Sequence, residues 1–78
     1  MADVAQRSTL DVFQALYDSE INCSLASDWN DGWRVTLEHP GGARAEATVG
    51  SVIEAAQWLH DRAHELFPDS EYVRRHPR

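Results

Sequence analysis

The longest regular pattern of apolar positions lies between Gly50 and Pro68. Apolar residues recur there at spacings of three and four, as on one face of an amphipathic helix. They are Val52, Ala55, Ala56, Leu59, Ala63 and Leu66. Ser51 and Glu54 match a capping box, in which the serine accepts from the Glu54 N–H and the carboxylate reaches back to the Ser51 N–H. Pro68 cannot continue a helix and disfavours helical dihedrals at Phe67. We therefore predict a helix from Ser51 to Phe67.

Three segments with alternating apolar and polar residues precede this helix. Apart from Ala26, their apolar residues occupy odd positions, namely Ile21, Cys23 and Leu25, then Trp33, Val35 and Leu37, then Ala43, Ala45, Ala47 and Val49. The stretches DWNDG (28–32) and HPGG (39–42) between them have turn composition. The alternation predicts an antiparallel meander with one buried and one solvated face. Because cross-strand partners point to the same side, Leu37 can face Ala43 or Ala45, which predicts a second turn of three or five residues.

A shorter helical pattern lies before the first strand. Ser8 or Thr9 can cap a helix that runs to about Asp18. Its apolar face is predicted to hold Leu10, Phe13, Leu16 and Tyr17, with Val12 near the edge. Residues 1–8 and 69–78 carry no burial pattern and are predicted to be flexible, exposed ends. The predicted fold is therefore a single α+β domain over residues 1–78: helix, three-stranded antiparallel meander, helix (αβββα), with both helices on the odd-numbered face.

Composition and charge narrow the function classes. The 78 residues have a net charge of −6, with seven arginines and no lysine, a bias that we associate with a bacterial origin. An acidic body repels phosphate backbones, so nucleic-acid binding by the body is disfavoured. The basic tail YVRRHPR (72–78) is suited to an acidic partner or to another subunit, and a nucleic-acid role is left to this tail alone. A single cysteine, no apolar run near the N-terminus and no segment long enough to span a bilayer predict a cytoplasmic protein without a membrane partner.

Two sets of residues are candidates for chemistry. His60 and His64 lie one helical turn apart, so they can share a divalent metal, although two imidazoles need further ligands. The alternative is a solvated helix face. Cys23 is a candidate nucleophile, and the alternative is a small apolar group on the inner face of a strand. No nucleophile elbow or phosphate-binding loop accompanies them. We therefore expect a non-catalytic protein with no cofactor.

Protein contact is the function that the remaining residues favour. A domain of this size buries only about 60–65% of its unfolded surface, which favours dimerisation or a partner. Three tryptophans are many for 78 residues. We expect Trp33 in the core, whereas Trp29, which lies in a turn, and Trp58 are candidate interface anchors. Arg34 and Arg44 lie among mixed charges on the predicted solvated face and are further interface candidates. We expect a homodimer or another protein partner.

Two families share parts of this pattern. The order helix, meander, helix resembles the double-stranded RNA-binding domain, whose second helix begins with a basic cluster. The corresponding residues here, Gly50 to Glu54, contain no basic residue, so the RNA-binding role is not carried over. The stretch DGWRVTLEHPGGARAEATVGSVIEAAQWL (31–59) resembles the strand–strand–helix core of HicB-type antitoxins. The first helix departs from that family, and no DNA-binding segment follows. This resemblance implies an acidic inhibitor of a small basic partner protein.

Overall fold

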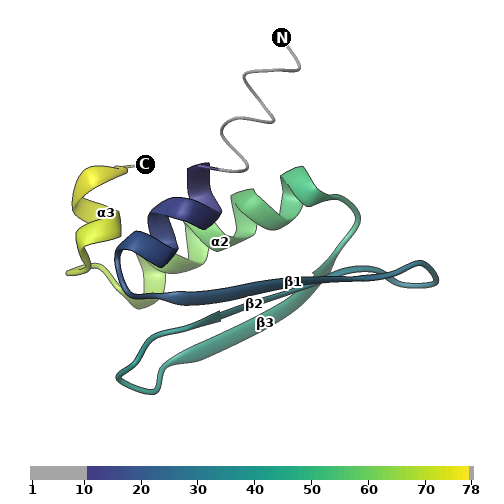
Figure 1. Cartoon of the computed structure of the whole chain (residues 1–78), viewed down its shortest axis with the longest axis horizontal. Helices are drawn as coiled ribbons and strands as arrows, with labels where there is room; N and C mark the ends of the chain where they lie inside the picture. The colour runs from purple at the N-terminus through teal and green to yellow at the C-terminus, as the bar shows by residue number, and fades with distance from the viewer. Residues whose placement is uncertain (1–10, 78) are drawn as a thin grey trace, which may run out of the picture.

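The computed structural model describes residues 11–77. A helix over residues 11–18 is followed by strands β1 (Asn22–Asp28), β2 (Gly32–Glu38) and β3 (Arg44–Val49) and by helices α2 (Val52–Leu66) and α3 (Glu71–Arg75). The strands form one antiparallel sheet in the order β1-β2-β3, with the helices on one side of it (Figure 1). The predicted α+β architecture is confirmed. The predicted caps Ser8 and Thr9, Leu10 and the N-terminal end 1–8 lie outside the described residues.

The sheet register follows the predicted parity. Leu37 pairs with Cys23 on one side and with Ala45 on the other, so odd residues face odd residues throughout. Five residues, 39–43, separate β2 from β3, and the His39 N–H donates to the Ala43 carbonyl at 2.9 Å. Val35 and Leu37 are fully buried on the odd-numbered face beneath α2. The alternation in the sequence thus places one face of the sheet in the core.

Helix α2 begins as the sequence predicts, with one difference. The Glu54 N–H donates to the Ser51 hydroxyl at 3.1 Å. The Glu54 carboxylate, however, accepts from the Gly50 N–H at 3.2 Å, one residue before the predicted donor. The prediction that Leu66 is buried is wrong, because its side chain is 39% exposed. The helix ends at Leu66, and Phe67 leaves helical geometry with its side chain buried in the core instead.

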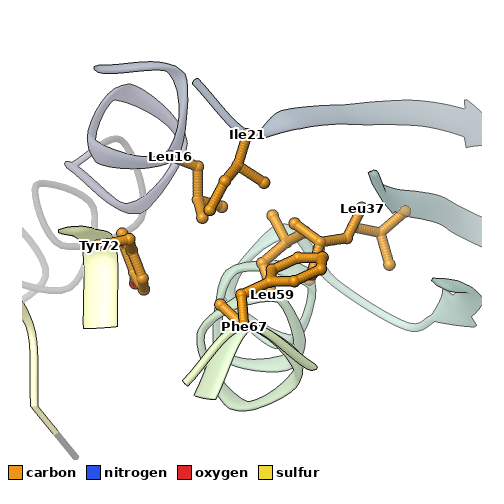
Figure 2. Close-up of a cluster of buried hydrophobic side chains, with 9 residues drawn as sticks. Leu16, Ile21, Leu37, Leu59, Phe67 and Tyr72 are labelled. Carbon is orange, nitrogen blue, oxygen red and sulfur yellow. The ribbon is translucent and has the colours of Figure 1, made fainter. Parts of the chain in front are cut away.

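The hydrophobic core joins all elements of the described chain (Figure 2). Its buried members are Leu16, Ile21, Val35, Leu37, Ala55, Leu59, Ala63, Phe67 and Tyr72. The first helix contributes Leu16, with Val12 and Phe13 packed beside it. The prediction that Tyr17 belongs to this face is wrong, because Tyr17 is 75% exposed. Consecutive helical residues are turned by about 100°, so the residue after Leu16 points past the core.

The C-terminal stretch is not an exposed tail throughout. Ser70 caps the short helix α3 by accepting from the Val73 N–H at 3.2 Å. The next turn places Tyr72 against the core with 1% of its surface exposed (Figure 2). The prediction that this segment has no burial pattern is therefore wrong at Tyr72. A lone aromatic among charged residues has no periodicity, so only the Ser70 cap signalled the helix.

Candidate protein-contact surface

The even-numbered face of the sheet is open. All helices of the described chain lie on the odd-numbered face, so no described element covers the even-numbered residues (Figure 1). We call this surface the open face; its side chains are Asn22, Ser24, Ala26 and Asp28 on β1, Arg34, Thr36 and Glu38 on β2, and Arg44, Glu46 and Thr48 on β3. The hydroxyls of Ser24 and Thr36 hydrogen-bond across the strands. The fold thus presents a flat, polar surface to its surroundings.

Trp29 lies at one end of this surface. It belongs to the β1–β2 turn, which extends beyond the N-terminal end of α2 (Figure 1). Trp29 is 92% exposed to solvent. With Ala26, Asp28 and Arg34 it lines a shallow hollow. A second hollow adjoins the first on the β3 side, because Asp28 and Arg34 also line it, together with Thr48. Arg34 therefore lies between two hollows, one of which carries an exposed indole.

The other two tryptophans are less exposed. Trp58 is partly buried and packs against the core cluster from the flank of α2. Trp33 was expected in the core, but it is only partly buried, and it is not among the side chains packed against the core cluster in the described residues. Its position near the β1–β2 turn, opposite Ser27 and Val49, places it towards the end of the sheet. Of the three indoles, Trp29 alone is presented almost whole to solvent.

The charges of the open face nearly cancel. Its two arginines and three carboxylates leave a net charge of −1 in a chain whose net charge is −6. Arg44 and Glu46 lie side by side on β3, with 3.8 Å between the guanidinium and the carboxylate. Both side chains are more than half exposed, so this pair contributes little to stability. The open face is therefore close to neutral although the chain as a whole is acidic.

The candidate pair His60 and His64 faces helix α3 instead of forming a solvated helix face. Their ring centroids are 4.4 Å apart, and each ring makes a T-shaped contact with the Tyr72 ring. The Tyr72 hydroxyl and His60 Nδ1 are hydrogen-bonded at 2.8 Å. His64 donates from Nδ1 to the His60 carbonyl at 2.9 Å, and His76 stacks on Tyr72 with 4.9 Å between the ring centroids. These contacts attach α3 to α2. The contribution of Tyr72 and His76 to this contact was not predicted from the sequence.

The contacts of this cluster show how far His60 and His64 are arranged to bind a metal ion. One nitrogen of each of His60 and His64 is engaged in a hydrogen bond within the protein. The remaining ring nitrogen of His64, Nε2, is buried without a hydrogen-bond partner in the described part of the chain. Within residues 11–77, no group of three or more His, Cys, Asp or Glu side chains is arranged to hold a metal ion. We therefore describe the cluster as a contact between helices.

The contact between α2 and α3 is expected to lose stability at high pH, because Tyr72 ionises there. Burial, and then the charge of Asp61, raise the pKa of Tyr72 from 10.0 to about 12. Because the folded pKa lies above the unfolded one, the stabilisation is complete below pH 10 and is lost as the pH rises towards 12. We expect the loss to be roughly 2–3 kcal/mol, measured by urea denaturation at pH 8 to 12. Tyr72→Phe, the matched control, should lose clearly less over this range. An equal loss in both proteins would contradict the assignment.

Cys23 lies at an inward position of β1, as predicted. It is partly buried, packs against the core cluster, and is a free thiol. Burial raises the pKa of the Cys23 thiol above its ordinary value. Since the thiolate is the reactive form, this environment makes the sulfur a poorer nucleophile than an exposed cysteine. The geometry favours the alternative in which Cys23 is a small apolar group of the core.

Comparisons with known proteins add no relative to this picture. No family model, no curated protein and no solved structure matches the chain. Among residues 11–77, none of the helices has the length and apolar character needed to cross a bilayer.

Proposed function

We propose that this chain is a non-catalytic protein that acts by protein–protein contact, and that it is a homodimer. The observation that carries the protein–protein contact is the open face, a whole side of the sheet that no described element covers, with Trp29 92% exposed at its end. Exposed aromatic residues beside an arginine are typical of interface anchors. The small domain size supports a partner as well, because its own core buries a limited share of the chain. We place this role in the cytoplasm, where a lone thiol such as Cys23 stays reduced.

The solution mass tests the homodimer. We expect light scattering to give twice the monomer mass at micromolar concentrations, in buffer of physiological ionic strength. Salt at this level shortens the reach of repulsion between two copies of charge −6 to about 8 Å. A monomer mass at every concentration would contradict the homodimer.

A second candidate function is inhibition of a small basic partner protein. The observation that favours it is the turn itself, in which Asp28 and Asp31 flank the exposed Trp29. The Asn30 N–H donates to the Asp28 carboxylate at 3.1 Å, which holds that carboxylate beside the indole. An aromatic anchor between two carboxylates suits a basic surface with an apolar depression.

Co-expression tests this second candidate. A small basic protein encoded next to this chain should co-purify with it, and Trp29→Ala should remove the complex while the mass of the free chain stays unchanged. Trp58→Phe is a matched control, because Trp58 packs against the core and should leave the complex intact. The absence of such a neighbouring gene, together with the absence of a complex, would contradict the inhibitor role.

A further inference from the structure

Strand β3 is an open edge of the sheet. It pairs with β2 on one side, and none of the described strands pairs with its other side. The His39–Ala43 hydrogen bond fixes which residues bond to β2, because hydrogen-bonded pairs alternate along an antiparallel ladder. By this alternation the odd residues of β3 bond to β2. The backbone N–H and C=O groups of Arg44, Glu46 and Thr48 therefore point away from the sheet.

The features that usually block such an edge are few here. Strand β3 contains no proline, and its register with β2 runs without a bulge from Arg44 to Val49. Helix α2 lies over the odd-numbered face and does not cover the edge (Figure 1). The remaining protection is charge, and it consists of one cation and one anion two residues apart, Arg44 and Glu46. Such a pair stabilises the registers of an added strand that bring opposite charges together and destabilises those that bring like charges together.

We infer that β3 pairs with β3 of a second copy, antiparallel, about a two-fold axis through Ala45. This inference rests on the proposed homodimer and names the surface that forms it. The outward backbone groups belong to even residues, so even residues must pair with even ones. A two-fold axis through Ala45 places Arg44 of each copy opposite Glu46 of the other, which gives two ion pairs across the new ladder.

The neighbouring registers lack this complementarity. An axis through Glu46 places the two Glu46 carboxylates opposite one another, and an axis through Ala47 places Glu46 opposite Thr48 of the second copy. Strand β1, the other edge, has Asn22, Ser24, Ala26 and Asp28 at its even positions, so no register of β1 with itself pairs opposite charges. Charge thus selects one edge and one register.

The odd-numbered face is compatible with this arrangement. Ala45 meets Ala45 of the second copy, and Ala43 meets Ala47, so the β3 side chains that meet on this face at the new junction are methyl groups. The result is a continuous six-stranded sheet whose two open faces merge. Trp29 and Arg34 lie away from the junction, at the β1–β2 end of each copy, and stay available to a further protein partner.

Charge reversal at the two positions tests the register. Arg44→Glu and Glu46→Arg should each place like charges opposite one another and raise the dimer dissociation constant at least about tenfold. An equimolar mixture of the two variants should restore the dimer, because each then meets an opposite charge. The double variant R44E/E46R should dimerise on its own, and Arg34→Glu, which reverses a charge outside the junction, should leave the mass unchanged. Sedimentation or light scattering gives the readout.

A disulfide tests the axis without relying on charge. Paired residues that are not hydrogen-bonded have Cα atoms about 4.5 Å apart, within disulfide range. Ala45→Cys, in a Cys23→Ala background, should therefore oxidise to a covalent dimer. Ala47→Cys in the same background should not, because it faces Ala43 of the second copy. Equal cross-linking of both variants, or of neither, would overturn the register.

The outcomes separate the two proposals. A wild-type monomer at every concentration overturns the homodimer and the β3 junction together. A wild-type dimer that none of the substitutions at 44, 45 or 46 affects overturns the β3 junction alone and leaves a homodimer formed by another surface.

Discussion

Replacing Leu59 by alanine is expected to lower the free energy of unfolding by about 3 kcal/mol. Leu59 is fully buried at the centre of the core, where α2 meets β2 and the first helix (Figure 2). The change removes several methyl and methylene groups from the core. It leaves a cavity that neighbours such as Leu37 and Leu16 can fill only in part. In a domain of this size such a loss is a large share of the total stability.

Leu66→Ala is the matched control on the same helix. Leu66 is 39% exposed and is not in the core cluster, so we expect its loss to be below about 1 kcal/mol. Urea denaturation followed by circular dichroism, at one protein concentration for both variants, measures the difference. Equal losses at the two positions would show that the core is not centred on Leu59 as described.

The strands and their register were predictable because one simple pattern controls them. Alternation places the odd residues of the three strands on one side, and a slip by one residue would move all of them to the other face. The turn residues Gly32 and Gly42 do take positive φ values, as turn chemistry requires. The alternation along each strand and the composition of the turns were therefore enough to predict which face of the sheet is buried.

The ends of the helices were less predictable, because there the direction of the chain decides which side chain is buried. Periodicity extends the buried stripe of α2 to Leu66, but the chain turns at Phe67 and brings that ring into the core instead. The same turn leads into α3 and buries Tyr72, whose partners His60 and His64 are twelve and eight residues earlier. Neither outcome follows from periodicity within a single helix.

The candidate contact surface was predictable in part. The parity of the strands places Arg34 and Arg44 on the open face, and the structure shows no described element above them. The exposure of Trp29 followed from its position in a turn, whereas Trp33 and Trp58 differ in packing in ways that the spacing of residues does not encode. The open edge of β3 became visible only with the strand order, because the sequence does not say which strand lies at the margin.

Replacing Gly32 by alanine is expected to lower the free energy of unfolding by about 2–3 kcal/mol, for two reasons that act together. Gly32 has a φ of +106°, a conformation that residues with a Cβ rarely adopt. A Cβ placed there would also lie 2.5 Å from the Val49 carbonyl oxygen, at the point where β3 leads into α2. The backbone would have to move at the β1–β2 turn and at the start of α2 at once.

Gly42→Ala separates these two reasons. Gly42 has nearly the same φ, +107°, but nothing lies within 4 Å of the position that a Cβ would take. This variant therefore carries the backbone strain without the clash, and we expect a loss of about 1 kcal/mol. The difference between the two variants, measured by urea denaturation, gives the contribution of the close approach to Val49. Equal losses would mean that the β1–β2 turn shifts away from β3 without resistance. In that case the sheet would not fix the position of Trp29 at the end of the open face, and the contact surface there would not be preformed.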